Sequence, residues 1–156
     1  MATQLVTGGA GFIGSCYVLA RCAAGDTIIN IDKLTYSGNL ENLASLQDCS
    51  RHIFVHGDIG NAELVEYLLK TYQPNAIVNF AAESHVDRSI IDPEAFVRTN
   101  VLGTCTLLRT AKAWWSQLTA AKKAAFRFLH ISTDEVFGAL QPGDPAFTET
   151  TPYSPN

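Results

Sequence analysis

The sequence carries little charge and contains no long apolar segment. Only 17% of its 156 residues are charged, and 11 basic side chains stand against 15 acidic ones, for a net charge of −4. A chain with so few basic residues lacks the cationic surface that nucleic-acid binding requires, so we expect no nucleic-acid partner. The longest apolar stretches, 76–82 and 124–131, are far shorter than the roughly 20 residues that span a bilayer, so we expect no membrane segment.

Leader signals, paired cysteines and metal-ligand sets are also missing. No positive charge precedes the glycines that begin at Gly8, which is unlike a secretory signal, and we expect a cytoplasmic protein. His52 and His56 are four residues apart in a strand-like segment without a third ligand, so we expect no metal site. The cysteines lack C-x-x-C spacing, which favours free core thiols in a reducing compartment. They are Cys16, Cys22, Cys49 and Cys105.

Against these absences, 47% of the residues are hydrophobic, which excludes disorder and suits a single folded domain. Strand-like and helix-like segments alternate along the chain. Because repeated strand–helix units require a parallel sheet covered on both faces, the predicted fold class is α/β, a doubly wound parallel sheet of strand order 3-2-1-4-5. The expected strands are 5–7, 27–31, 53–55, 76–80 and 126–132, and the expected helices are 12–24, 40–46, 62–72 and 93–118.

Glycines gather between the first expected strand and the first helix. They fit both G-x-G-x-x-G (Gly9, Gly11, Gly14) and G-x-x-G-x-x-G (Gly8, Gly11, Gly14). Glycine permits a tight turn and a close approach of a pyrophosphate to the backbone, and a helix N-terminus attracts phosphate. The pattern predicts a dinucleotide site; the alternative is a structural turn.

An acid follows the second expected strand. Asp32 lies 18 residues after Gly14, where a carboxylate accepts hydrogen bonds from the ribose hydroxyls of a dinucleotide. Because this charge would repel a 2′-phosphate, the pattern favours NAD over NADP, and Lys33 is the one opposing feature. The alternative is a surface acid.

The third and fourth expected strands end in further candidate contacts. Asp58 follows the third strand and is a candidate acceptor for the adenine amino group, with Ile59 packed on the ring. A cap on the following helix is the alternative for Asp58, and both roles stay open. Ala81 and Ala82 follow the fourth strand and are small enough for a dinucleotide to pass closely.

Two adjacent acids, Asp134 and Glu135, follow the fifth expected strand. Neighbouring strand residues face opposite sides, so both acids reach one cleft only if the strand ends near Ser132. An acid and a base beside a cofactor provide general acid–base catalysis, and the Thr133 hydroxyl can orient a substrate. The alternative is a helix capping box, Ser132-x-x-Glu135, and the residue pattern leaves both interpretations open.

Residues 6–14, 32–40, 81–89 and 131–138 together resemble the dTDP-glucose 4,6-dehydratases, a group of the extended short-chain dehydrogenase/reductase family. The similarity extends over essentially the whole chain. The trio Thr133, Asp134 and Glu135 separates these dehydratases from related epimerases and reductases, which usually carry small residues there. The resemblance therefore favours the acid–base interpretation.

The resemblance implies NAD-dependent dehydration of a nucleoside-diphosphate glucose, dTDP-glucose, to a 4-keto-6-deoxy sugar for deoxysugar (rhamnose) biosynthesis. Hydride leaves the 4-carbon for NAD, Glu135 removes the proton on the 5-carbon, Asp134 protonates the departing 6-hydroxyl, and hydride returns to the 6-carbon. Ser84 and Thr133 are implied to contact the substrate, and His85, Asp87 and Arg88 to lie in the same pocket. The implied NAD contacts are Gly8, Gly11, Phe12, Ile13, Gly14, Asp32, Lys33, Leu34, Thr35, Asp58, Ile59, Phe80, Ala81, Ala82, Glu83, Ser84 and Thr99.

Two departures from the family pattern matter. Phe137 stands where the family usually has tyrosine, and the 156 residues contain no Tyr-x-x-x-Lys pair, which in the family removes the 4-hydroxyl proton. Residues 152–156 resemble the segment just upstream of that helix. We therefore expect an amino-terminal fragment in which 1–156 form an NAD-binding Rossmann domain, incomplete at its C-terminal end, without the substrate domain and inactive alone. Such a fragment would leave the fifth strand as an open sheet edge.

The expected helix 93–118 is apolar on two sides. One stripe is formed by Val97, Val101, Leu108, Ala111, Trp115 and Leu118, with Leu107 and Trp114 off it. A helix with two apolar sides needs a second partner besides the sheet, and the resemblance implies a homodimer through this helix. A wide core face is the alternative.

Three other functions compete with the dehydratase hypothesis. A nucleotide-sugar epimerase or reductase of the same family would not depend on Asp134 and Glu135. A stand-alone NAD-binding module would be closed and monomeric at this length. A structural protein with an empty glycine turn is disfavoured by the position of Asp32.

Overall fold

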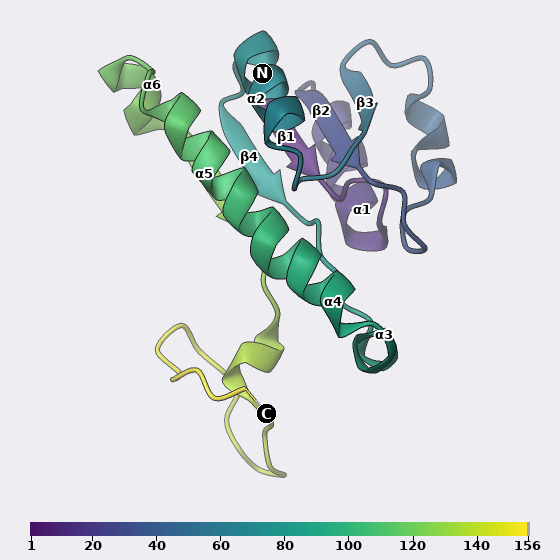
Figure 1. Ribbon diagram of the computed structural model, residues 1–156, viewed down its shortest axis with the longest axis vertical. Helices are drawn as coiled ribbons and strands as arrows, with labels where there is room; N and C mark the ends of the chain where they lie inside the picture. The colour runs from purple at the N-terminus through teal and green to yellow at the C-terminus, as the bar shows by residue number, and fades with distance from the viewer. Residues whose placement is uncertain (156) are drawn as a thin grey trace.

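A parallel sheet forms the centre of the molecule in the computed structural model, which describes residues 1–155 (Figure 1). Asn156, the end of the segment 152–156, lies outside the described residues. All strand pairs in the described part run parallel, and the strand order is β3-β2-β1-β4-β5, which confirms the predicted order. The strands are β1 (Thr3–Thr7), β2 (Thr27–Asp32), β3 (His52–His56), β4 (Ala76–Asn79) and β5 (Arg127–His130).

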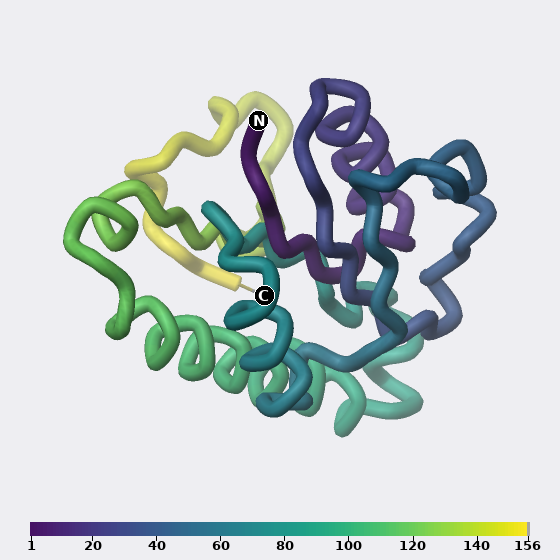
Figure 2. The backbone as a smooth tube through the Cα atoms, turned by 90° about the horizontal axis from the view of Figure 1, so that it is seen from above, coloured from purple at the N-terminus to yellow at the C-terminus, as the bar shows by residue number. Residues whose placement is uncertain are grey.

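Helices cover both faces of this sheet, as expected for apolar strands in a parallel arrangement. Figure 2 shows α1 on one side and the long helical segment that ends in α5 on the other. The helices are α1 (Phe12–Ala23), η1 (Leu40–Leu46), α2 (Ala62–Tyr72), α3 (Val86–Ile91), α4 (Pro93–Phe96), η2 (Val97–Gly103), α5 (Thr104–Trp115), α6 (Ala120–Ala125) and η3 (Asp134–Phe137). Of these, η1 and η3 are 3₁₀-helices and η2 is a π-helical turn.

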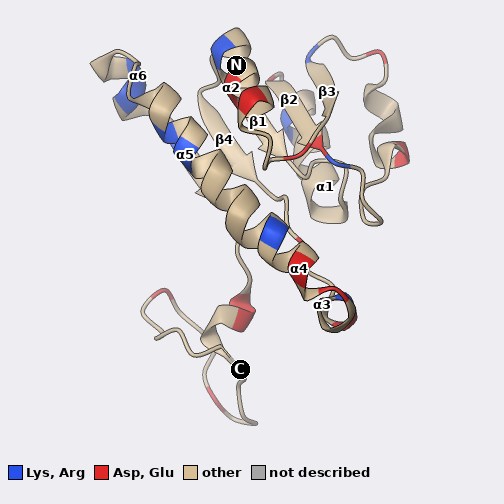
Figure 3. Ribbon diagram, in the orientation of Figure 1, with Lys and Arg blue, Asp and Glu red and all other residues tan. Residues whose placement is uncertain are grey.

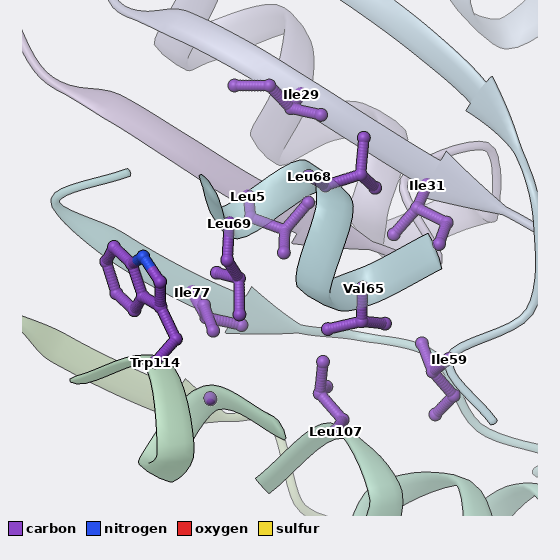
Figure 4. Close-up of a cluster of buried hydrophobic side chains, with 11 residues drawn as sticks. Leu5, Ile29, Ile31, Ile59, Val65, Leu68, Leu69, Ile77, Leu107 and Trp114 are labelled. Carbon is purple, nitrogen blue, oxygen red and sulfur yellow. The ribbon is translucent and has the colours of Figure 1, made fainter. Parts of the chain in front are cut away.

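Two apolar clusters hold the layers together. The first joins β1, β2 and β4 to α2 and α5, and its side chains meet in Figure 4. The second lies on the opposite face, where Val18 of α1 and Leu43 of η1 pack against Val6 and Ile28. Because helices cover both faces, β1, β2 and β4 are almost entirely buried. The edge strand β5 is exposed, with Leu129 half accessible.

The predicted helix ends are partly confirmed. Gly25 follows α1 with a φ of +92°, and Asp92 caps the helix that begins at Pro93 by accepting from the N–H of Ala95. The predicted helix 93–118 is instead α4, η2 and α5 in succession, and it ends at Trp115. The helices α3 and α6 were not predicted, because each spans six residues and is too short to show an apolar period. The fifth strand is also shorter than predicted, since Phe126 ends α6 and the strand stops at His130.

The buried face of α5 differs from the predicted stripe. Leu107, Ala111 and Trp114 face the core, although the predicted stripe contains only Ala111 of these three. The predicted stripe residues Val97, Val101, Leu108 and Trp115 are 36–58% exposed. The helix is therefore apolar on two sides, as expected. Of the predicted stripe only Ala111 and Leu118 pack in the core, which is formed mainly by the other side.

The cysteines are free, but only partly in the core. Cys22 is buried and Cys49 is half-buried, whereas Cys16 and Cys105 are exposed, so the expectation of core thiols is wrong for the latter two. Figure 3 shows Lys and Arg along α5 and α6 without acids between them, whereas Asp and Glu gather around α3 and α4. Among the described residues, no helix is long and apolar enough to cross a membrane.

Candidate functional site

A cleft of about 990 Å³ opens at the carboxyl ends of the strands, where parallel α/β sheets bind ligands. The glycine turn, the segments after β2, β3 and β4, the π-helical turn η2 and the segment after β5 all contribute to its walls. The predicted site residues that line it are Gly8, Gly11, Phe12, Ile13, Gly14, Asp32, Lys33, Thr35, Asp58, Ile59, Phe80, Ala81, Ala82, Glu83, Ser84, Thr99, Thr133, Asp134 and Glu135.

Several expected residues lie elsewhere. Leu34 does not line the cleft, because its side chain packs against the second apolar cluster while its backbone adopts a φ of +54°. His85, Asp87 and Arg88 also lie outside the cleft wall, to which their neighbours Val86 and Ser89 contribute instead.

The glycines of the turn have separate reasons to be glycine. Gly8 has a φ of +69°, and a Cβ there would lie 2.7 Å from the amide nitrogen of Ala81. A Cβ on Gly14 would lie 2.2 Å from the carbonyl oxygen of Gly8, so the approach of α1 to β1 requires glycine. Gly11 is different, because a Cβ there would meet nothing closer than the Gly8 carbonyl oxygen at 3.3 Å. Gly8 and Gly14 therefore serve the fold, while Gly11 leaves space beside the unpaired N–H groups at the start of α1.

Asp32 is nearly buried at the end of β2, and backbone N–H groups hold its carboxylate. Oδ2 accepts from the N–H of Ala10 at 2.9 Å, and Oδ1 accepts from the N–H of Leu34 at 2.8 Å. A Cβ on Gly38 would lie 2.8 Å from Oδ1, so glycine keeps that side of the carboxylate open. The carboxylate is thus oriented and still has acceptor positions toward the cleft.

Lys33, the opposing feature for NAD, is paired with an acid. Its Nζ lies 2.7 Å from Oδ2 of Asp58, and both side chains are partly exposed. Partial burial raises the pKa of Asp58, but hydrogen bonds from Lys33 and from the Gly60 N–H outweigh it, and the pKa lies below its ordinary value. The alternative of Asp58 as a helix cap is wrong, because Asn61 caps α2 by accepting from the N–H of Leu64. Ile59 is buried against Gly103.

The segment after β4 is held by a residue that the sequence did not reveal. Oδ1 of Asn100 accepts from the N–H of Glu83, and its Nδ2 donates to the Glu83 carbonyl oxygen, both at 2.8 Å. Asn100 lies in η2, and π-helical turns within α-helices often mark functional positions. Only its position beside Thr99 could have suggested it.

A hydrogen-bonded chain crosses the buried end of the sheet. The Ala81 N–H donates to Oγ1 of Thr7 at 3.3 Å, and the Thr7 hydroxyl donates to Oδ1 of Asn79. Nδ2 of Asn79 then faces Nδ1 of His130 at 2.9 Å, and His130 lines the cleft. The sequence provided no signal for this chain, because it joins residues of three strands.

The acid pair lies on the 3₁₀ turn η3, directly after the sheet. Asp134 and Glu135 are exposed and line the cleft, and neither carboxylate forms an ion pair within residues 1–155. The alternative of a capping box at Ser132 is wrong, because Thr133 caps the turn by accepting from the N–H of Glu135 at 3.2 Å. This cap uses the Glu135 backbone, so both carboxylates remain free to meet a ligand.

The segment that follows η3 packs against the end of this turn. The ring of Phe137 packs against Phe147 and Tyr153, with centroid distances of 5.1 and 5.5 Å. The N–H of Ser154 also donates to the carbonyl oxygen of Val136 at 2.9 Å. The irregular C-terminal segment thus fastens the end of the turn that carries the two acids.

Known proteins share this sequence pattern and fold. The dTDP-glucose 4,6-dehydratase of Xanthomonas campestris is 57% identical over the whole chain, which covers 44% of that protein. The crystal structure of the Streptomyces venezuelae dTDP-glucose 4,6-dehydratase with NAD bound is 44% identical, with a TM-score of 0.84 over 99% of this chain and 46% of that one. The Thermus thermophilus UDP-glucose 4-epimerase, in complex with NAD, is 29% identical, with a TM-score of 0.80 over 98% of this chain and 44% of that one.

The chain therefore spans less than half the length of the curated relatives it matches. The model of the GDP-mannose 4,6 dehydratase family matches residues 5–156, which is nearly the whole chain. Together with the parallel sheet and the lined cleft, this match shows that the chain belongs to the GDP-mannose 4,6 dehydratase family.

Proposed function

We propose that residues 1–156 form the NAD-binding domain of a dehydratase that converts dTDP-glucose to its 4-keto-6-deoxy derivative. The observation that carries the proposal is that the glycine turn, Asp32 and the adjacent acids Asp134 and Glu135 all line one cleft. A dinucleotide site alone would explain the first two features, and the acid pair adds a second chemical function. The similar dehydratases of Xanthomonas and Streptomyces support the same substrate class.

The residues at the adenosine end of the cleft fit NAD. The open side of Gly11 and the N-terminus of α1 suit a pyrophosphate, and the oriented carboxylate of Asp32 suits the two ribose hydroxyls. Asp58 engages Lys33 and so reduces its attraction for a 2′-phosphate, which favours NAD over NADP. When bound, NAD supplies the hydride acceptor and donor for the sugar.

The acid pair supplies the elimination step. We assign to Glu135 the removal of the proton from the 5-carbon of the sugar, and to Asp134 the delivery of a proton to the departing 6-hydroxyl. Because Asp134 and Glu135 lie on a 3₁₀ turn and not on a strand, whose neighbouring side chains face opposite sides, both carboxyls can reach the same sugar ring. Ser84 and Thr133 line the same cleft and are assigned to substrate binding.

The proton on the 4-hydroxyl needs a further base. Because the 156 residues contain no Tyr-x-x-x-Lys pair, we propose that this base lies outside them and that residues 1–156 alone have no dehydratase activity. We also propose a cytoplasmic location, consistent with free cysteines in the part of the chain that the structure describes. A homodimer through the exposed apolar side of η2 and α5 would cover Val97, Val101, Leu108 and Trp115.

An epimerase is the second candidate, because the Thermus UDP-glucose 4-epimerase shares the fold at 29% identity. The two functions differ in the need for Glu135. We expect the protein expressed from its complete reading frame to exchange the hydrogen on the 5-carbon of dTDP-glucose with solvent deuterium, and the Glu135→Gln variant to lose this exchange.

A matched Glu149→Gln variant removes an acid that does not line the cleft and should leave the exchange unchanged. Undiminished exchange in Glu135→Gln would refute Glu135 as the base, and absence of exchange in the wild-type protein would refute the dehydratase assignment and favour the epimerase. Calorimetric titration of residues 1–156 with NAD and NADP tests the cofactor separately, and we expect the tighter binding for NAD.

A further inference from the structure

Two walls of the cleft touch through a pair of side chains that do not themselves line it. The guanidinium carbon of Arg88 lies 3.8 Å from the centroid of the Tyr36 ring, and the His85 ring meets the same tyrosine edge-on at 6.4 Å. Tyr36 belongs to the loop after β2, whereas His85 and Arg88 belong to the segment after β4. The contact therefore joins parts of the chain that are about fifty residues apart in sequence.

The neighbours of these residues form the facing walls. Thr35, Ser37 and Gly38 line the cleft from the first loop, and Glu83, Ser84, Val86 and Ser89 line it from the second. We propose that Tyr36 and Arg88 are positioning residues that latch these two walls together and thereby slow the release of the bound dinucleotide. This inference rests on the proposed NAD site.

Separate hydrogen bonds hold each wall to its own part of the fold, so the Tyr36–Arg88 contact controls the distance between the two walls. The first loop is fastened to the glycine turn, because the N–H of Asn39 donates to the Ala10 carbonyl oxygen at 3.0 Å. The second is fastened to η2 by the two hydrogen bonds between Asn100 and the Glu83 backbone. Neither anchor connects one loop to the other, whereas the Tyr36–Arg88 contact does.

The surroundings of Tyr36 support the latch. Partial burial and, after it, the nearby Glu83 carboxylate raise the pKa of the Tyr36 hydroxyl. The Tyr36 ring thus carries a cation of the opposite wall on its face, and the Glu83 carboxylate of the same wall lies near its hydroxyl. A guanidinium stacked on tyrosine keeps its planar face against the ring, an arrangement that a lysine ammonium reproduces poorly.

Retention of the dinucleotide matters for the proposed reaction. Hydride is removed from the 4-carbon and later returned to the 6-carbon, so the same dinucleotide has to remain in the cleft throughout. A latch between the two walls lengthens this residence without any contact to the reacting atoms.

The test is the dissociation rate of NADH from residues 1–156. The protein is loaded with NADH, mixed in a stopped-flow instrument with excess NAD, and followed by the fluorescence of the bound NADH. We expect Tyr36→Ala and Arg88→Ala each to accelerate NADH release about five- to tenfold, because each variant removes one cation–π contact. Because the two residues act as one contact, the double variant should release NADH no faster than the faster single variant.

Matched controls separate the latch from general effects. Tyr67→Ala removes an exposed tyrosine of α2, and Arg109→Ala removes an exposed arginine of α5; neither lines the cleft, and both should keep the wild-type rate. Tyr36→Phe keeps the ring and should stay close to wild type. Arg88→Lys keeps the charge and should release NADH nearly as fast as Arg88→Ala, whereas a wild-type rate in Arg88→Lys would indicate a purely electrostatic role of Arg88. The two conservative variants also serve if an alanine variant fails to fold.

The outcomes are distinct. Release rates of the Tyr36 and Arg88 variants equal to those of the controls, or additive effects in the double variant, would overturn the latch while leaving the NAD site intact. Failure of the wild-type chain to bind NADH at all would overturn the proposed cofactor site, and the latch with it.

Discussion

Nδ2 of Asn79 lies 2.9 Å from Nδ1 of His130, at the end of a hydrogen-bonded chain whose direction is determined by its first donor. The Ala81 N–H can only donate, so the Thr7 hydroxyl passes its own hydrogen to Oδ1 of Asn79. The Asn79 amide then turns its nitrogen to His130. Because an amide nitrogen only donates, Nδ1 of His130 accepts and the hydrogen of the neutral imidazole lies on Nε2.

This relationship predicts a single tautomer. Nitrogen-15 NMR of the imidazole groups should show His130 as the Nε2–H form, with Nδ1 unprotonated. Thr7→Val removes the hydroxyl that orients Asn79 and should allow both tautomers of His130. His56, whose Nε2 lies 3.1 Å from the Lys33 carbonyl oxygen, is an internal reference that should not change. An Nδ1–H form in the wild-type protein would contradict the proposed direction of the chain.

The glycine turn predicts two opposite phenotypes. Gly8→Ala should lower the free energy of unfolding by more than about 1–2 kcal/mol. The alanine would have to adopt a left-handed backbone conformation, and its Cβ would also clash with the backbone of Ala81. Gly11→Ala should keep the stability within about 1 kcal/mol, the usual range for changes at a helix N-cap. It should nevertheless weaken NAD binding about tenfold or more, through the space that the methyl group occupies.

Urea unfolding and calorimetric NAD titration, applied to both variants, test this division. A Gly11→Ala protein that binds NAD as tightly as the wild type would show that the open side of Gly11 does not receive the ligand.

The Lys33–Asp58 pair predicts a change in coenzyme preference. In Asp58→Asn the ammonium of Lys33 loses its partner and becomes free to meet a 2′-phosphate, so the NADP affinity should rise about two- to fivefold, in line with the strength of exposed ion pairs. Competitive titration with NAD and NADP measures it. The double variant Lys33→Ala, Asp58→Asn should lose the gain, and an equal gain in that variant would show that Lys33 is not its source.

Asp26 predicts a pH-dependent contribution to stability. Its nearly buried carboxylate accepts from the Ala2 N–H at 2.8 Å, from Nε2 of Gln4 at 2.9 Å and from Nε of Arg21 at 2.8 Å. The Ala2 hydrogen bond lowers its pKa, burial opposes this, and Arg21 and Gln4 add to the lowering, so the pKa lies below the ordinary value of 3.8. The stabilisation is therefore complete above pH 3.8 and is lost as the pH falls through the lower pKa of the folded state.

Asp26→Asn should cost about 1.5–3 kcal/mol of unfolding free energy at pH 7, the range for hydrogen bonds to a charged group, and the deficit should shrink on acidification below pH 3.8. Asp48→Asn, at an exposed position, should change little at either pH. Urea unfolding from pH 7 to pH 3 measures both variants. A deficit that stays constant across this range would exclude the charge of Asp26 as its cause.

The outer side of α5 predicts dimer contacts. Leu108→Glu places a charge on the half-exposed apolar side and should shift residues 1–156 toward monomer in sedimentation equilibrium. Tyr67→Glu places the same charge on an exposed residue of α2 and should leave the association unchanged. Wild-type protein that is monomeric at high concentration would refute a dimer made by these residues alone.

The order of the strands and most of the residues that line the cleft were predictable from the sequence, because both follow from local signals. Each apolar strand is followed by a helix with its own cap or stop, and parallel connections leave few other topologies. The ends of parallel strands meet at one edge, so Gly14, Asp32, Asp58 and Ala81 had to converge there.

What the sequence did not reveal depends on contacts between distant segments. An α-helix with apolar residues on two sides has two candidate core faces. Packing against α2 buries Leu107 and Trp114 and leaves Leu108 and Trp115 outside the core. The cap on η3 shifted from Ser132 to Thr133 because β5 ends at His130, earlier than its apolar run suggests. Asn100 and the chain from Ala81 to His130 join separate elements and have no local signature.

The stack of Phe137 on Phe147 and Tyr153 has a consequence for how this protein can diverge. Lengthening or shortening the loop that connects these rings would shift the turn η3 and move the carboxylates of Asp134 and Glu135 away from the cleft. Insertions that a surface loop ordinarily tolerates should therefore be rare between positions 138 and 152, because the proposed acid–base chemistry would constrain a stretch that has almost no regular structure of its own.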